Sequence, residues 1–295
     1  MLRPDEYMSK AVTARLKDRV LPELDDLEFS AWASLLEQRV GLLITPDRRS
    51  FLASGIRYRM RNTGCRNYGE YYRKLESEHL QAQEWSLLVD RLTVHETCFF
   101  RHQRSMNLVE EVVLPEAFSG KDHFHAWSVG CASGEETWSL AMLADHYCAS
   151  NRRQLFFGVT GTDISLPALK QARSGVYLNR RLADIGKQFQ QRYCKVHSDQ
   201  HFSVCRHLRK RVCFTQLNLR DVANAPFGSL DLIFCQNLLI YFDRERRRKI
   251  VNALAEYLRP DGVLILGPGE LMGWEHPEMQ KVRYEDTLAY RHSSR

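Results

Sequence analysis

The chain has 295 residues, of which 44% are hydrophobic, so it is long enough for one large domain or two modest ones. It contains no apolar run near ~18 residues and no apolar segment at its start, so we expect neither a membrane-spanning helix nor a secretory signal. Its eight cysteines form no C-x-x-C pair, which favours reduced thiols in a cytoplasmic protein and argues against a metal site.

Residues 26–118 have a helical pattern. In FSAWASLLEQRVGLLI the apolar residues recur every three or four positions, which predicts an amphipathic helix. Thr45 followed by Pro46 predicts the start of another helix, and QEWSLLVDRLTV predicts a third. We therefore expect a helical N-terminal domain over 26–118, after an N-terminal extension over 1–25.

From about residue 123 short apolar runs alternate with helical segments. Strands are predicted over 124–129, 154–163, 212–219, 230–239 and 262–267, and a helix over 244–258 separates the last two strands. This alternation predicts an α/β domain with a doubly wound parallel sheet over 119–295, with VRYEDTLAYR as a short hairpin at the sheet edge. Residues 178–211 interrupt the alternation and are predicted to form a small antiparallel β-insertion.

The turn SVGCASGEE directly follows the first strand, where an open α/β sheet binds its ligand. Gly130 and Gly134 let the backbone approach a ligand closely, although a tight strand–helix turn explains them as well. Asp163, at the tip of the next strand, suits the two hydroxyls of a ribose, although a helix N-cap explains it as well. Glu135 and Glu136 would repel a pyrophosphate and suit an ammonium or sulfonium group, so these residues favour S-adenosylmethionine over a nicotinamide dinucleotide.

The stretch VHETCFFRH begins as the zinc motif H-E-x-x-H does, but position 99 is Phe, so the spacing excludes that motif. Four blocks in order instead resemble those of the CheR-type chemotaxis-receptor glutamate O-methyltransferases: LTVHETCFFR, WSVGCASGEETWSLAM, GTDIS and IFCQNLLIYFD. The resemblance runs from about residue 26 to 291. It implies a Rossmann-like methyltransferase fold, S-adenosylmethionine as cofactor, S-adenosylhomocysteine as product, and methyl esters formed on receptor glutamates.

Carried over position by position, the resemblance also implies the site residues. The cofactor-binding residues would be His95, Thr97, Arg101, Gly130, Gly134, Glu135, Glu136, Asp163, Asn218, Leu219, Gln236 and Asn237. Arg101 and Tyr241 would act as catalytic residues that hold the reacting groups; the alternatives are a structural arginine and a core tyrosine. Phe99 and Phe100 would pack the wall of the site.

Two positions depart from the family pattern. His95 stands where the family has Asn, and Gln236 stands where it has Arg, which would remove a cation from beside the substrate carboxylate. These departures make a pilus-associated, chemotaxis-like pathway as compatible with the sequence as flagellar chemotaxis.

A dense basic group in the helical domain indicates the partner. Arg57, Arg59 and Arg61 have little opposing acid, so we expect them to dock an acidic surface, and the resemblance implies the acidic helical cytoplasmic region of a methyl-accepting receptor. We expect a monomer that binds no nucleic acid and does not insert into a membrane.

Two alternative functions stay open. A nucleic-acid methyltransferase is disfavoured because residues 236–239 read QNLL, without the proline of a [D/N]-P-P-[Y/F]-like turn. The departure at Gln236 leaves room for a non-catalytic adaptor that binds S-adenosylmethionine.

Overall fold

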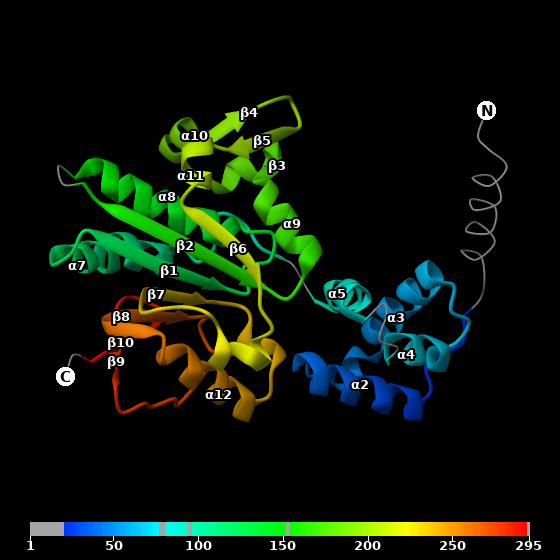
Figure 1. Cartoon of the computed structure of the whole chain (residues 1–295). Helices are drawn as coiled ribbons and strands as arrows, with labels where there is room; N and C mark the ends of the chain where they lie inside the picture. Colours follow the sequence, from blue (N-terminus) through cyan, green and yellow to red (C-terminus); the bar gives the residue numbers. More distant parts are fainter. Residues whose placement is uncertain (1–20, 77–80, 94–95, 152–153, 294–295) are drawn as a thin grey trace. The chain divides into compact units, whose positions relative to one another are not determined.

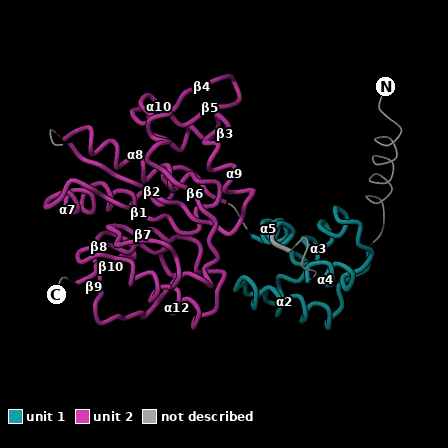
Figure 2. Tube along the Cα trace, viewed as in Figure 1, with its two compact units in different colours: residues 1–94 teal, residues 95–295 magenta. Residues whose placement is uncertain are grey.

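The computed structural model describes residues 21–76, 81–93, 96–151 and 154–293. The chain forms two compact units, residues 1–94 and residues 95–295 (Figure 2). The predicted domain boundary, after residue 118, lies later than this division. The difference arises because the helical segment after residue 102 packs on the sheet of the second unit rather than among the first helices.

The first unit is helical in its described part. Its helices are α2 (Asp26–Val40), α3 (Arg49–Thr63), α4 (Tyr68–Glu76) and α5 (Gln81–Leu92), with the 3₁₀ turn η1 (Pro46–Arg48) before α3. Asp25 caps α2 by accepting a hydrogen bond from the Glu28 N–H at 2.7 Å. In the core, the Trp32 ring stacks on the Tyr71 ring with centroids 5.6 Å apart.

The second unit is built on a seven-stranded sheet. Its strands are β1 (His123–Val129), β2 (Phe156–Asp163), β6 (Val212–Gln216), β7 (Leu230–Cys235), β8 (Leu258–Leu266), β9 (Met279–Val282) and β10 (Leu288–His292). Their spatial order is β6-β2-β1-β7-β8-β10-β9. The first five pair in parallel, whereas β10 runs antiparallel to both β8 and β9, so the predicted parallel sheet with an edge hairpin is confirmed.

Helices cover both faces of this sheet (Figure 1). One face packs against α6 (Gln103–Leu108), the π-helical turn η2 (Val109–Val113), α7 (Leu114–Ser119), α8 (Glu135–Ser150) and α9 (Leu166–Ser174). The other face packs against α12 (Arg244–Ala255) and the 3₁₀ turns η4 (Leu219–Asn224) and η5 (Leu239–Tyr241). Successive residues of β1 alternate between the two cores: Ala126 lies in the first and Trp127 in the second.

The insertion between α9 and β6 forms a separate three-stranded antiparallel sheet, as predicted. Its strands β3 (Val176–Leu178), β4 (Cys194–Val196) and β5 (His201–Val204) have the order β3-β5-β4. The insertion also contains the 3₁₀ turn η3 (Asn179–Asp184) and the helices α10 (Lys187–Tyr193) and α11 (Arg206–Arg209), which the sequence pattern did not predict.

The path of the chain sets the position of the site. The chain moves outward from β1 to β2 and β6 and then crosses to β7 on the other side of β1, so the strand order reverses between β1 and β7. Ligands of open α/β sheets bind outside the carboxyl ends of the strands at such a reversal. Among the described residues, no helix combines the length and the apolar character that crossing a bilayer requires.

Candidate functional site

The glycine turn after β1 is held against the end of β2. The N–H groups of Gly130 and Cys131 donate to the carbonyl oxygen of Thr162 at 2.8 and 2.9 Å. Gly130 and Gly134 have φ values of 72° and 94°, which favour glycine. A Cβ would lie 2.6 Å from Leu238 at Gly130 and 2.7 Å from the Ala172 Cβ at Gly134. Both glycines are therefore required by the packing of the turn itself, the alternative that the sequence left open.

Asp163 lies at the end of β2 and its side chain reaches the glycine turn. One carboxylate oxygen accepts from the Ala132 N–H and the other from the Ser165 N–H, both at 2.9 Å. The N-cap of α9 is Ser165, whose side chain accepts from the Ala168 N–H at 3.1 Å. The alternative role as a helix cap therefore falls to Ser165, and Asp163 is left fixed beside the turn.

Glu135 and Glu136 begin α8 and are both buried, with 3% and 9% of their surface exposed. The Ser128 hydroxyl donates to Glu136 at 2.7 Å, and the Ser133 hydroxyl donates to Glu135 at 2.6 Å. Burial raises the pKa of Glu136 to about 8 and raises the pKa of Glu135, because a buried carboxylate loses its hydration. An adjacent cation would favour both ionised forms, so this pair fits the ammonium or sulfonium of S-adenosylmethionine.

A third buried acid, Glu270, was missed by the sequence reasoning. It follows β8, has 3% of its surface exposed, and accepts from the N–H groups of Gly267 at 2.8 Å and Leu239 at 3.0 Å. Its charge raises the pKa of Glu136 further, whereas Arg101 lowers it. The site therefore contains three buried carboxyl groups whose pKa values are raised by burial, and Arg101 and Arg181 oppose this shift at Glu136 and Glu135 respectively.

The stretch before α6 is anchored in two ways. The Phe100 N–H donates to the Ser139 hydroxyl of α8 at 2.9 Å, and the Arg101 guanidinium donates to the Glu96 carbonyl. The Phe99 ring meets the Tyr177 ring edge-on at 5.0 Å, and the Phe100 ring lies 5.1 Å from the Phe189 ring. The two phenylalanines thus pack the β-insertion against this stretch, and their expected role as a site wall stays a prediction.

Thr97 is half-buried, and His95 lies outside the described residues.

The segment after β7 joins the same site. Asn237 has a positive φ of 58°, and its side-chain oxygen lies 2.6 Å from Nε2 of His102, the residue that precedes α6. Tyr241 lies half-buried in η5. Asn218 precedes η4 and caps it, since its side chain accepts from the Arg220 N–H at 3.1 Å. Partly buried Leu219 packs on the core that contains β7. His102 carried no recognisable signal in the sequence.

The Gln236 side chain is buried and bonded within the domain. Its side chain has 5% of its surface exposed, and its amide nitrogen donates to the Ser105 hydroxyl at 2.8 Å and to the Leu266 carbonyl at 3.2 Å. The Gln236 side chain therefore ties β7 to α6 and β8 inside the domain. Its predicted position beside the substrate carboxylate stays a prediction.

Comparison with known proteins identifies the family. Residues 95–288 match the model of the CheR methyltransferase SAM-binding domain, and residues 27–93 match that of the CheR methyltransferase all-alpha domain. The chain belongs to the CheR methyltransferase family. It has the fold of an S-adenosylmethionine-dependent methyltransferase, and S-adenosylmethionine is its cofactor.

Individual relatives cover most of the chain. The chemotaxis protein methyltransferase of Borreliella burgdorferi is 31% identical over 82% of this chain and 87% of its own length. That of Escherichia coli is 31% identical over 84% of this chain and 85% of its own length. A solved structure, magnesium protoporphyrin IX methyltransferase from Synechocystis with bound SAM, superposes with a TM-score of 0.38 at 15% identity over 81% of this chain and 96% of its own.

The basic group of this CheR methyltransferase divides into buried and exposed members. The Arg59 guanidinium donates to both carboxylate oxygens of Glu84, at 2.9 and 2.7 Å, and both side chains are only 12% exposed. The Tyr71 hydroxyl donates to the same carboxylate at 2.7 Å. Arg57 is half-buried and donates to the Ala53 carbonyl, whereas Arg61 is exposed. Arg59 is therefore removed from the predicted docking residues because its charge is neutralised within the unit.

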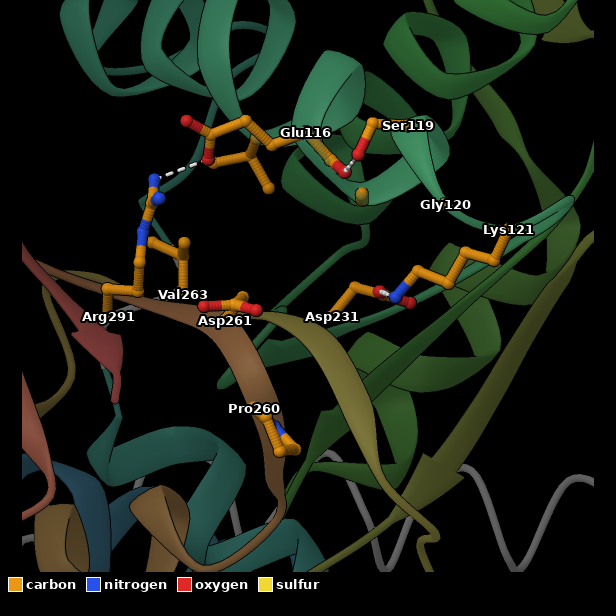
Figure 3. A pocket seen from close by; sticks show the side chains of 11 residues that line it. Glu116, Ser119, Gly120, Lys121, Asp231, Pro260, Asp261, Val263 and Arg291 are labelled. Carbon is orange, nitrogen blue, oxygen red and sulfur yellow. Dashed lines mark hydrogen bonds and ion pairs between the residues drawn. The ribbon is translucent and has the colours of Figure 1, made fainter. Parts of the chain in front are cut away.

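A cavity of about 490 Å³ lies at the other edge of the sheet, where β7 and β8 begin (Figure 3). Four of its charged residues form two ion pairs: Lys121 with Asp231, and Arg291 with Glu116. This edge is opposite the carboxyl ends that carry the acids described above, so the cavity is separate from the cofactor site. Among the described residues, no group of His, Cys, Asp and Glu is placed to hold a metal ion.

Proposed function

We propose that this CheR methyltransferase acts in the cytoplasm and transfers the methyl group of S-adenosylmethionine to glutamate side chains of a methyl-accepting receptor. The products are a γ-glutamyl methyl ester and S-adenosylhomocysteine. The observation that carries this proposal is the match to chemotaxis protein methyltransferases along both units of the chain. The buried acids beside the glycine turn support it independently, because they suit a positively charged methyl donor.

Each side of the site would hold one part of the cofactor. When bound, S-adenosylmethionine supplies a methyl group made electrophilic by its sulfonium. Asp163, already oriented by two backbone N–H groups, would bind the ribose hydroxyls. Glu136, with Glu135 beside it, would bind the amino end, and the backbone of Gly130 and Gly134 would line the turn.

The other predicted cofactor residues surround the remaining parts. Thr97 and His95 would lie on one side, and the adenosine would be enclosed by Asn218, Leu219, Gln236 and Asn237. Gln236 would also act indirectly. Its amide nitrogen donates to the Ser105 hydroxyl, and this bond would fix the segment that carries Asn237.

The chain does not need a general base for this reaction. A glutamate of ordinary pKa, ~4.3, is already ionised at neutral pH, so its carboxylate is ready to accept a methyl group. What the protein must do is orient the carboxylate and exclude water, and such orientation contributes up to ~7–11 kcal/mol in ideal cases. Arg101 would hold the carboxylate by charge, and Tyr241 would line the opening through which it enters.

The docking of the receptor would use the exposed arginines of the helical unit. Arg61 is exposed on α3, and Arg57 is partly exposed one turn before it. Receptor methylation regions are helical and rich in glutamate, so opposite charges would attract the two surfaces.

The test is methyl transfer to receptors. The purified enzyme is incubated with radiolabelled S-adenosylmethionine and membranes that contain methyl-accepting receptors, and the label is then treated with mild base. Label on a receptor-sized band that base releases as methanol establishes a carboxyl methyl ester. Base-stable label indicates N-methylation and refutes the proposal, and bound cofactor without any labelled protein supports the adaptor instead.

A further inference from the structure

Two exposed apolar side chains lie on neighbouring loops after β7 and β8. Ile240 is 52% exposed in η5, and Met272 is 80% exposed in the loop that follows β8. Exposed apolar side chains become buried only when a partner covers them. Apolar side chains that lie on adjoining loops indicate an interaction surface more often than apolar side chains scattered singly over the protein do.

The two loops are fastened to each other by the chain's own polar groups. The Arg247 guanidinium donates to the Phe242 carbonyl at 2.8 Å and to the Glu270 carbonyl at 3.0 Å. The Glu270 carboxylate accepts from the Leu239 N–H at 3.0 Å. Ile240 and Met272 are therefore presented on a rigid platform rather than on independent loops.

The platform is strongly basic on one side. Between residues 244 and 249 the chain has five basic residues and one acid. Arg247 is used to fasten the loops, and Lys249 pairs with Glu245 at 2.6 Å. Arg244 and Arg248 are exposed at the start and middle of α12, and Arg248 also reaches the Gly273 carbonyl at 3.1 Å in the Met272 loop.

The platform adjoins the opening proposed for the substrate, because Ile240 directly precedes Tyr241. A helix whose apolar residues recur every three or four positions, with glutamates flanking them, would cover the apolar pair and place acids against the arginines. The reacting glutamate of such a helix would then lie beside Tyr241.

We propose that the catalytic unit has its own docking surface for an acidic amphipathic helix of the receptor, in addition to the arginines of the helical unit. This rim surface consists of four exposed side chains: Ile240, Arg244, Arg248 and Met272. The inference rests on the proposed function, since receptor methylation supplies the acidic helix that matches the surface in charge and in apolar character.

The experiment compares steady-state methylation of a purified cytoplasmic receptor fragment by the wild-type enzyme and two double variants. One variant carries Ile240→Ser with Met272→Ser, and the other carries Arg244→Glu with Arg248→Glu. We expect each to raise the KM for the fragment about tenfold or more, with kcat and the Kd for S-adenosylmethionine unchanged. The single variant Met272→Ser, at the most exposed position of the surface, gives a smaller increase and guards against misfolding of the doubles.

Matched controls carry the same chemical changes elsewhere. Arg206→Glu with Lys210→Glu reverses two exposed charges on and next to α11, and Val196→Ser removes a side chain that is 56% exposed on β4. We expect the control variants to leave the KM within about twofold of wild type, because screened long-range charge effects are small at 0.15 M salt.

The outcomes distinguish a failure of the docking surface from a failure of the proposed function. If wild type methylates the fragment and the rim variants have unaltered KM, the docking surface is refuted while the proposed function stands. If wild type methylates no receptor fragment, the proposed function fails and this inference fails with it. Gel filtration of wild type and variants adds one more outcome: a change from dimer to monomer in the variants would show a contact between copies of the chain and overturn receptor docking.

Discussion

The protonation of Glu136 should control the pH dependence of stability in the absence of cofactor. Burial raises its pKa from 4.5 to about 8 in the folded chain. Since the folded pKa lies above the unfolded one, the folded state holds an extra proton between these values. The contribution to stability is then complete below about pH 4.5 and is lost as the pH rises through 8.

The size of the effect follows from the pKa difference. The full rise corresponds to about 5 kcal/mol, and between pH 6 and pH 8 a single group of this kind lowers the free energy of unfolding by roughly 2–3 kcal/mol. The perturbation is Glu136→Gln, which keeps an oxygen that accepts from the Ser128 hydroxyl but cannot ionise. Its stability should vary less with pH than that of wild type by about this amount.

The assay is urea unfolding of the cofactor-free protein at several pH values from 6 to 9. The difference between wild type and variant isolates Glu136, because Glu135 and Glu270, whose pKa values are raised in the same direction, are present in both proteins. Parallel pH profiles for the two proteins would refute the reasoning.

The same residue predicts how cofactor affinity changes with pH. A bound ammonium favours the ionised Glu136, so binding of S-adenosylmethionine should release a proton below pH 8 and become tighter as the pH rises toward 8. Calorimetry in two buffers of different ionisation enthalpy measures this proton directly. In Glu136→Gln the release should be smaller and the affinity lower, and an unchanged release would mean that another group titrates.

Three further substitutions test other parts of the structure. Asp163→Ala should raise the Kd for S-adenosylmethionine roughly 10- to 100-fold by calorimetry, because a charged hydrogen-bond acceptor is lost; an unchanged Kd would remove Asp163 from the cofactor site. Gly134→Ala should lower the free energy of unfolding by about 1–3 kcal/mol, since its Cβ would lie 2.7 Å from that of Ala172 at a φ of 94°; full stability would show that the turn can relax. Arg59→Met should destabilise the protein by about 1–3 kcal/mol in urea, because the partly buried Glu84 carboxylate loses its charged partner and keeps only the Tyr71 hydroxyl, while receptor KM stays constant; a raised KM at full stability would return Arg59 to the docking surface.

Much of the site was predictable because strand ends align in a parallel sheet. Short apolar runs located β1, β2 and β7. Gly130, Asp163 and Asn237, which lie at or just after the carboxyl ends of these strands, had to meet at one edge once the strands paired in parallel. The acids at 135 and 136 could be assigned to the same edge because they begin the helix that follows β1. Local sequence thus determined the strands of the main sheet, their order along the chain and the acids at 135, 136 and 163, but not Glu270 or the helices α10 and α11.

Tertiary packing decided which side chains remain available. Arg59 and Arg61 look alike in the sequence, but Arg59 points to Glu84 on a helix 25 residues later, so only the fold separates a partly buried ion pair from an exposed charge. Gln236 likewise donates to Ser105, 131 residues earlier, a contact that no local sequence pattern indicates. The position of residues 103–119 on the sheet has the same cause, since their helical pattern fixes an apolar face but not the surface that buries it. The sequence by itself determined the elements and the chemistry at their ends, whereas burial and pairing depend on contacts between distant segments, which only the tertiary structure supplies.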